Sequence, residues 1–112
     1  MSLDWSEAFP YPVTVCNTHG TIVYMNQASI QQFAGEGGER LVETNLLDCH
    51  PEPARSKLEK MLRSGESNSY TTEENGQRKL IVQAPWRQDG LYAGLVEISI
   101  PLPADLPHFI RE

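Results

Sequence analysis

The sequence predicts an α+β fold: a five-stranded antiparallel sheet with short helices and one longer helix packed on one face. Three observations support this prediction. Two strand-like stretches joined by a short turn occupy residues 12–25, near the N-terminus. A helical stretch follows in the middle of the chain, at residues 53–64. Three more strand-like stretches close the chain, joined by the hairpin signals Asn75-Gly76 and Asp89-Gly90.

The first strand pair and the residues after it are predicted from local residue preferences. Residues 12–17 alternate like a strand, residues 18–20 form a turn, and residues 21–25 are β-branched and aromatic. Asn26 is a good N-cap for a short helix at residues 27–33. The glycine-rich residues 34–38 predict a flexible loop. Short apolar anchors follow, at Leu41-Val42 and Leu46-Leu47.

The longer helix is predicted from its apolar spacing. Pro53 suits the first helical position, and Ser64-Gly65 suits the end. One apolar stripe follows the spacing i, i+4, i+7, i+8 and consists of Ala54, Leu58, Met61 and Leu62. Charged residues on the opposite face can pair along the helix, namely Arg55, Glu59 and Arg63.

The closing strands are predicted at residues 69–72, 80–86 and 91–100. Pro85 cannot donate to a strand ladder, so it indicates an edge or a bulge. In the last strand Val96, Ile98 and Ile100 share one face, and Glu97 and Ser99 share the other. Prolines in residues 101–107 then end the strand, and the tail leaves the sheet.

Length and charge exclude several classes of protein. The 112 residues suit one domain, and no apolar run approaches the roughly 20 residues of a membrane span. The net charge is −6, and the nine basic residues are scattered among fifteen acidic ones, so nucleic acid is not an expected partner. The N-terminus carries no secretory signal pattern, so a cytoplasmic location is expected.

These elements, in this order, resemble the PAS family. Residues 17–28 resemble its first hairpin and first helix, Asn45-Leu46-Leu47 resembles its segment of a polar residue followed by apolar ones, and residues 67–100 resemble its three closing strands. The resemblance covers about residues 10–101. It divides the chain into a lead-in at 1–11, a PAS domain at 12–101 and a Pro-rich tail at 102–112.

The resemblance implies a non-enzymatic sensory and signal-relay module. PAS domains bind small molecules between helices and sheet, or pair with another PAS domain. They pass the change to an output domain or protein such as a histidine kinase, cyclase, phosphodiesterase or transcription factor. No such output motif occurs in this sequence, so a signalling partner outside this chain is expected. A ligand-free dimerisation and relay module with a packed core is the alternative.

The expected pocket lies between the inner helix face and the inner sheet face. Its helical candidates are Phe33, Leu46, Leu47, His50, Leu58, Met61 and Leu62. Its sheet candidates are Val15, Val23, Val82, Ala84, Val96 and Ile98, with Gln83 and Ser99 as polar groups beside His50. Simple core packing is the competing interpretation for each apolar residue.

Cys49-His50 is the segment whose side chains are most often found in catalytic or metal sites. A catalytic pair needs the imidazole to reach the thiol, and adjacent side chains rarely point at each other. A zinc site from Cys16, His19, Cys49 and His50 lacks a known ligand spacing. Haem held by His50 is a sharper hypothesis, because imidazole is a common axial ligand. Covalent flavin sensing is rejected, because the thiol is displaced from the motif of flavin-binding PAS domains.

A homodimer is also expected. The outer sheet face and the N-terminal segment often form the contact between PAS domains. The sequence supplies aromatic residues for such a contact, namely Trp5, Phe9, Tyr11, Trp86 and Tyr92. These rings could instead cover one another within one chain.

Overall fold

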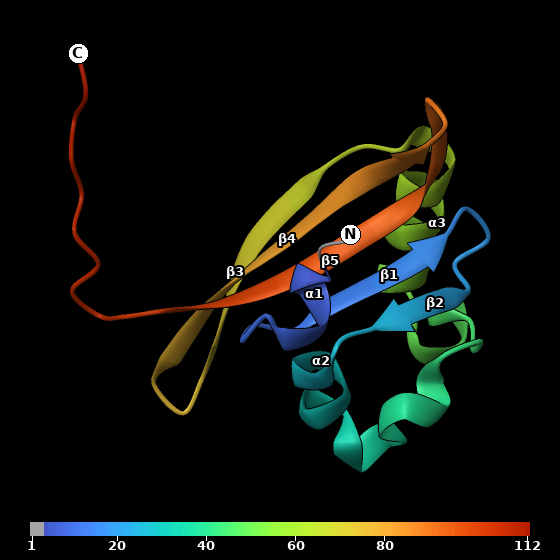
Figure 1. Ribbon diagram of the computed structural model, residues 1–112, viewed down its shortest axis with the longest axis horizontal. Coiled ribbons are helices and arrows are strands. Elements are labelled where there is room, and N and C mark those ends of the chain that lie inside the picture. The colour runs from blue at the N-terminus through green and yellow to red at the C-terminus, as the bar shows by residue number, and fades with distance from the viewer. Residues whose placement is uncertain (1–3) are drawn as a thin grey trace.

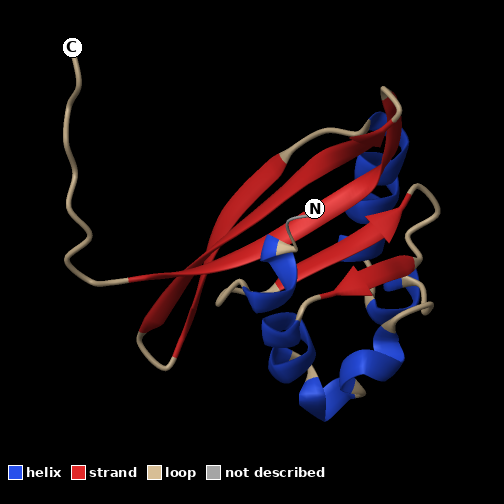
Figure 2. Ribbon diagram, viewed as in Figure 1, coloured by secondary structure: helices blue, strands red, loops and turns tan. Residues whose placement is uncertain are grey.

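The computed structural model describes residues 4–112, and its elements follow the order predicted from the sequence (Figures 1 and 2). The helices and 3₁₀ turns are α1 (Trp5–Ala8), α2 (Gln27–Gln32), η1 (Ala34–Glu36), η2 (Gly38–Leu41), η3 (Leu46–Cys49) and α3 (Ala54–Ser64). The strands are β1 (Val13–Asn17), β2 (Ile22–Met25), β3 (Asn68–Glu74), β4 (Gln77–Gln88) and β5 (Leu91–Leu102).

The five strands form one antiparallel sheet in the order β2-β1-β5-β4-β3. The last strand of the chain pairs with the first, with Val13 opposite Ile98 and Cys16 opposite Leu95. This pairing joins the N-terminal hairpin to the three closing strands. The fold is therefore the predicted α+β arrangement.

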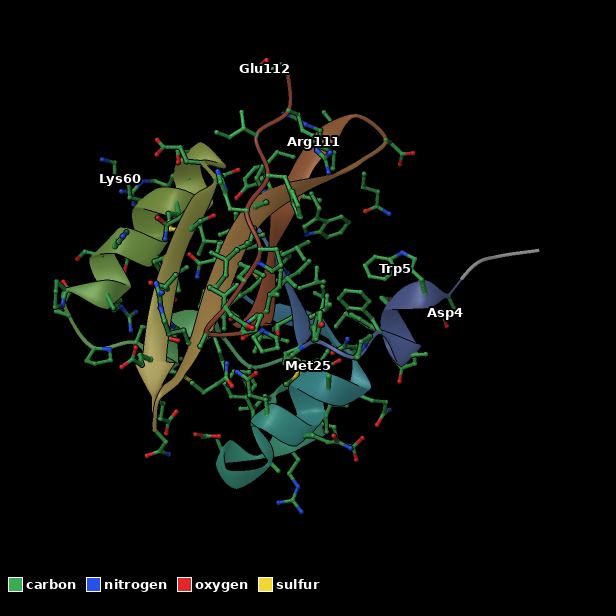
Figure 3. All side chains as sticks on the ribbon, turned by 90° about the vertical axis from the view of Figure 1, so that its left-hand side faces the viewer. Asp4, Trp5, Met25, Lys60, Arg111 and Glu112 are labelled. Atoms are coloured by element: carbon green, nitrogen blue, oxygen red, sulfur yellow. The ribbon has the colours of Figure 1, made fainter. Side chains whose placement is uncertain are left out.

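Two layers cover the sheet unequally. Helix α3 lies on one face, here called the inner face, and α1 lies on the other, the outer face (Figure 1). A view turned by 90° shows Lys60 on α3 and Trp5 on α1 on opposite sides of the sheet (Figure 3). The inner face is therefore the face that the longest helix covers.

Helix α3 is amphipathic, as its apolar spacing predicts. Leu58, Met61 and Leu62 are buried and pack with Cys16 and Leu95 of the sheet. Burying each of these side chains contributes roughly 1.5–3 kcal/mol to folding. On the wet face Arg55 pairs with Glu59 at 3.3 Å. The helix begins at Ala54, one residue after the predicted Pro53, and ends at Gly65 in the left-handed conformation.

Asn26 joins the lead-in to the domain. Its side chain is fully buried, and its Oδ1 accepts from the backbone N–H groups of Ser29 and Val13 at 2.9 Å. Its Nδ2 donates to the carbonyls of Ser6 and Tyr11 at 2.9 Å and of Phe9 at 3.4 Å. One residue therefore caps α2, as predicted, and also anchors residues 6–13.

The lead-in is more regular than the sequence suggests, since it contains α1. Glu7 on this helix accepts hydrogen bonds from the Tyr24 hydroxyl at 2.8 Å and from Gln27 at 2.7 Å. The rings of Trp5, Phe9 and Tyr11 stack edge to face in sequence, with centroids 5.3 and 5.5 Å apart. These three aromatic residues therefore cover one another within the chain, although Trp5 keeps 54% of its surface exposed.

The expected loop at residues 34–38 is instead built from two 3₁₀ turns, η1 and η2. 3₁₀-helices usually occur as short pieces of three or four residues, which is the length of both turns here. Both hairpin predictions hold: Asn75-Gly76 and Asp89-Gly90 have positive φ at both residues, as type I′ turns require. Within residues 4–112 no helix combines the length and the apolar character needed to cross a bilayer.

Pro85 lies where β4 is locally an edge. The pairing of β4 with β3 ends at Gln83 opposite Asn68, two residues before Pro85. The register with β5 shifts between Trp86 and Arg87, immediately beyond it. The proline therefore stands beside a bulge and lacks a neighbour on the β3 side, consistent with its missing N–H.

Candidate functional site

Two adjoining cavities separate the helical layer from the inner face of the sheet. The first, of about 390 Å³, is lined by Thr14, Ile22, Met25, Phe33, Glu36, Leu41, Leu46, Cys49, His50, Tyr70 and Glu97. The second, of about 250 Å³, is lined by His50, Ala54, Lys57, Leu58, Met61, Asn68, Tyr70 and Gln83. His50 and Tyr70 line both. Volumes of this order suit small organic ligands.

A row of polar side chains crosses the inner face between the cavities. Cross-strand pairing places Thr14 of β1 opposite Glu97 of β5, Glu97 opposite Gln83 of β4, and Gln83 opposite Asn68 of β3. Residues paired in this way share one face of a sheet. We call Thr14, Glu97, Gln83 and Asn68 the polar row.

Hydrogen bonds orient the polar row. Asn68 Nδ2 donates to Gln83 Oε1 at 3.0 Å, and Gln83 Nε2 donates to Glu97 Oε1 at 2.8 Å. At the other end the hydroxyls of Thr14 and Ser29 are 2.6 Å apart. The row is thus tied to α2 at one edge and leads to the Glu97 carboxylate at its centre.

Glu97 is a half-buried carboxylate that makes no ion pair within residues 4–112. The structure records one ion pair between side chains of residues 4–112, Arg55 with Glu59, and it does not involve Glu97. Its negative field adds to burial in raising the pKa of the Tyr70 phenol, with burial the larger cause. Burial likewise raises the pKa of the Cys16 thiol, and Glu97 reinforces this effect.

His50 follows η3 and is held by its backbone surroundings. Asn45 caps η3 by accepting from the Leu47 N–H at 2.8 Å. His50 Nδ1 is 2.6 Å from the Leu46 carbonyl, to which it donates in the neutral tautomer that bears hydrogen on Nδ1. In this tautomer Nε2 is left as an acceptor, and the His50 side chain lines both cavities.

Cys49 lies beside His50 in the chain, but the arrangement offers no catalytic machinery. Cys49 is exposed at the rim of the first cavity, and the imidazole is engaged with Leu46 rather than with the thiol. In the part of the chain that the structure describes, no three His, Cys, Asp or Glu side chains gather to hold a metal ion. The zinc set of Cys16, His19, Cys49 and His50 does not assemble there.

Most of the helical pocket candidates lie at the cavities. Phe33, Leu46 and His50 line the first, and His50, Leu58 and Met61 line the second. Leu47 and Leu62 instead pack against the core cluster beneath α3 and are not part of either lining.

The sheet candidates require a correction. Val82 and Ile98 pair with each other, as do Ala84 and Val96, and these pairs alternate with the inward-facing polar row. Val82, Ala84, Val96 and Ile98 therefore lie on the outer face and line neither cavity. Val15 pairs with Val96 and shares that face, and Val23 is exposed on the edge strand β2.

The error has a physical cause. The alternation of residues 94–100 is predicted correctly from the sequence. The prediction also assumes that the apolar face of the strand is the face that meets the ligand, and this assumption is wrong here. In this chain the apolar row faces outward, partly beneath the lead-in, and the polar row faces the cavities. The pairing of Glu97 with Gln83 and Thr14 was the missing signal, and it depends on strand order. Other lining residues missed were Ile22, Met25, Glu36, Leu41, Cys49, Ala54, Lys57, Asn68 and Tyr70.

Two of the aromatic residues predicted for an interface make hydrogen bonds within the chain. Trp86 Nε1 donates to the Cys16 carbonyl at 3.0 Å, and the Tyr92 hydroxyl donates to the Leu62 carbonyl at 2.9 Å. Both side chains are half-buried and tie strands to neighbouring elements. These hydrogen bonds give both side chains a structural role within one chain, and a role in a dimer contact stays a prediction.

The lining does not fit haem. His50 suits an axial ligand, because a backbone carbonyl orients its Nδ1 and leaves Nε2 free. However, the first cavity contains the carboxylates of Glu36 and Glu97 and no Lys or Arg. Both carboxylates would repel the anionic propionates of a porphyrin and lose hydration against its apolar ring. A Soret band in the purified protein that disappears in His50→Ala would overturn this conclusion.

Solved structures share this architecture at low sequence identity. The PAS domain of BvgS from Bordetella pertussis superposes with a TM-score of 0.67 at 16% identity, covering 88% of this chain and 81% of that one. The Aer2 receptor from Vibrio cholerae, described as a dual PAS-heme oxygen sensor, gives 0.62 at 19%, covering 83% and 95%. A sensory box histidine kinase from Vibrio cholerae gives 0.62 at 14%, covering 84% and 82%.

The sequence itself matches a family model. No curated protein matches the chain. The model described as "PAS fold" matches residues 6–100, which include the whole sheet up to Ile100, both cavities and most of the lead-in. With the β2-β1-β5-β4-β3 sheet, this match shows that the chain belongs to the PAS family, whose domains occur in sensor kinases and receptors.

Proposed function

We propose that this PAS domain is a non-catalytic sensor that binds a small organic molecule in the first cavity and relays binding to a signalling partner. The observation that carries the proposal is the polar row facing a cavity whose other walls are mainly apolar. A few placed polar groups in an apolar pocket are typical of ligand sites. A packed relay domain has no need for a half-buried carboxylate at this position.

A route for the relay starts at Thr14. This residue lines the first cavity, and its hydroxyl bonds to Ser29 in the first turn of α2. Asn26 caps the same helix and binds the lead-in carbonyls. A ligand that displaces Thr14 or Met25 would therefore disturb the helix and the lead-in together. We expect the lead-in to change its contacts on ligand binding.

Native and denaturing mass spectra of the purified protein test the proposal. Extra mass in the native spectrum, lost on denaturation, is the expected result. Leu46→Trp should fill the first cavity and abolish the extra mass, whereas Leu91→Trp, at a position 73% exposed and outside the cavities, should retain it. A bare chain that also binds nothing from a metabolite extract would contradict the proposal.

A second role, dimerisation, is supported by the outer face. The pairs Val82–Ile98 and Ala84–Val96 form a half-buried apolar surface on the face of the sheet where α1 lies. Charged side chains are absent from these four positions, as is usual for the core of an interface. We propose that a second copy of this domain packs on this surface. In that assembly the lead-in would lie beside the contact and could pass the ligand signal to it.

Light scattering at about 100 µM tests the dimer, because complexes with standard-size interfaces persist at that concentration. We expect a dimer mass for the wild type and a monomer mass for Ile98→Lys. Leu91→Lys is the matched control and should remain a dimer. Circular dichroism must show that both variants fold, and a wild-type monomer would remove this role. The cytoplasmic location and the identity of the signalling partner remain predictions from the sequence.

A further inference from the structure

We infer that the ligand of the first cavity is an amphipathic organic cation, a protonated amine carried on a small apolar body. This inference rests on the proposed function, since it names the chemistry of the molecule that the same cavity would bind. It follows from the charges, the free hydrogen-bonding positions and the apolar walls of the cavity, taken in turn.

The charge of the lining has one sign. Glu97 projects from the centre of the sheet and Glu36 from η1, and no Lys or Arg is among the lining residues. Lys57, the one basic side chain at the site, lines the second cavity only. A half-buried carboxylate such as that of Glu97 gains from a cation placed beside it. An anionic ligand would instead add repulsion to the cost of its own desolvation.

The free hydrogen-bonding positions at Glu97 also favour a cation. A carboxylate accepts several hydrogen bonds, and among residues 4–112 Gln83 is the one side chain that donates to it, at Oε1. Asn68 fixes the Gln83 amide by donating to its carbonyl oxygen, so the amide cannot turn to offer an acceptor instead. The remaining positions on Glu97 are acceptors. An ammonium group, which has three donors and no acceptor, matches them.

His50 adds a second acceptor. Its Nδ1 hydrogen is engaged by the Leu46 carbonyl, so in the neutral imidazole Nε2 bears a lone pair, and the His50 side chain lines the cavity. Acceptors thus face the cavity from the sheet and from the helical layer. The donors that an anion or a carbonyl compound requires are fewer, chiefly the hydroxyls of Tyr70 and Thr14, and the Thr14 hydroxyl is already paired with Ser29.

The apolar walls define the rest of the ligand. Ile22 and Met25 of β2 and Phe33 after α2 are among the lining, together with Leu41 and Leu46 from the 3₁₀ turns. These side chains are suited to an aromatic or branched aliphatic body, whose burial contributes about 25 cal/mol per Å². The rings of Phe33 and Tyr70 can also receive a cation on their faces. A cation without an apolar body would leave these walls unfilled.

Three probes of similar shape test the inference: 2-phenylethylamine, 2-phenylethanol and 3-phenylpropionate. We expect the amine to bind the full chain about tenfold or more tightly than the alcohol at pH 7, since a charge-assisted hydrogen bond replaces a neutral one. The carboxylate should bind more weakly than either. Isothermal titration gives the affinities. Protection of the Cys49 thiol from alkylation reports whether the probe occupies the first cavity.

Two variants locate the effect. Glu97→Gln should remove the preference for the amine over the alcohol while leaving alcohol binding within about twofold. Glu73→Gln, on the exposed strand β3 and outside the lining, should bind all three probes as the wild type does. Both variants must give wild-type circular dichroism spectra, and Glu97→Asp should retain part of the preference.

The outcomes separate this inference from the proposed function. If the alcohol or the carboxylate binds best, or if the amine preference survives Glu97→Gln, the inference is wrong and the cavity remains a ligand site. If no probe binds but the native mass spectrum shows a retained neutral or anionic molecule, the inference again fails alone. If no probe binds, and the chain neither retains a mass nor binds anything from a metabolite extract, both the inference and the ligand-sensor proposal are overturned.

Discussion

Glu97 and Gln83 lie opposite each other on β5 and β4, and their side chains are joined by a 2.8 Å hydrogen bond on the face of the sheet that the cavities share. The same face carries the apolar contacts of Cys16 and Leu95 with α3. A charged carboxylate is therefore maintained a short distance from the hydrophobic core. Such a group is costly to desolvate, so its presence indicates a role other than stability.

Replacing Glu97 with glutamine should not destabilise the ligand-free protein. The amide keeps a hydrogen-bonding partner for Gln83 and removes a partly buried charge that makes no ion pair in residues 4–112. We expect the free energy of unfolding to rise by about 0–1 kcal/mol at pH 7. Urea unfolding measures it, with Glu73→Gln as the control. A loss above about 1 kcal/mol would mean that Glu97 serves the fold itself.

Asn26→Ala should be among the most damaging single substitutions. It removes the cap of α2 and leaves the buried N–H of Val13 and the lead-in carbonyls without their partner. A lost cap costs about 1 kcal/mol, and each buried group left unsatisfied costs about 1–3 kcal/mol. We expect a total loss of at least about 4 kcal/mol in chemical unfolding. Gln27→Ala removes only an exposed hydrogen bond to Glu7 and should cost less than about 0.5 kcal/mol.

Gly94→Ala should prevent normal folding. Gly94 has a φ of +143°, and a Cβ there would overlap the carbonyl oxygen of Cys16 and stand 2.8 Å from the Cα of Asn17. Both are backbone atoms of β1, so relief requires separating β1 from β5. We expect a loss of at least about 4 kcal/mol, or insoluble protein.

Gly90→Ala is the matched control for Gly94. Gly90 also has a positive φ, +81°, but no atom lies within 4 Å of the place that a Cβ would occupy there. Only backbone strain of about 1–2 kcal/mol is expected at this position. Comparable losses for the two substitutions would contradict the steric explanation.

Cys16 should make stability depend on alkaline pH. Burial, the larger cause, and Glu97 raise the pKa of its thiol in the folded protein above the ordinary value of about 8.5. A raised folded-state pKa means that the contribution is complete below about pH 8.5. It is lost as pH rises towards the folded-state value, because the unfolded thiol ionises first.

The measurement is the difference in unfolding free energy between wild type and Cys16→Ala from about pH 7.5 to about pH 10.5. Burial raises the pKa values of Tyr24, Tyr70 and Tyr92 in both proteins, so this part cancels. The additional rise that Cys16 causes in the pKa of Tyr92 belongs to the Cys16 effect being measured. We expect the wild-type advantage to shrink above about pH 8.5. A difference that is independent of pH would show that the thiol ionises alike in both states.

Local chemistry is enough to predict most elements. Asn26, the Asn75-Gly76 and Asp89-Gly90 turns and the α3 stripe ending at Gly65 each depend on neighbours within a few residues, and each behaves as predicted. The 3₁₀ turns at residues 34–41 and helix α1 do not follow from the sequence pattern. Both are too short for periodicity to show, and α1 depends on long-range contacts of Glu7 with Tyr24 and Gln27.

Propensities and spacing along the chain are sufficient for the element order, the hairpins, the long helix and the family resemblance, because each depends on residues close together in the sequence. Which face of β4 and β5 meets the helices depends instead on tertiary contacts. Alternation in residues 94–100 separates two faces but does not say which is inside. That choice follows from β1 pairing with β5 and from the lead-in covering the outer face, contacts between residues about 80 positions apart. The polar row, and with it the chemistry of the candidate site, is a consequence of that pairing.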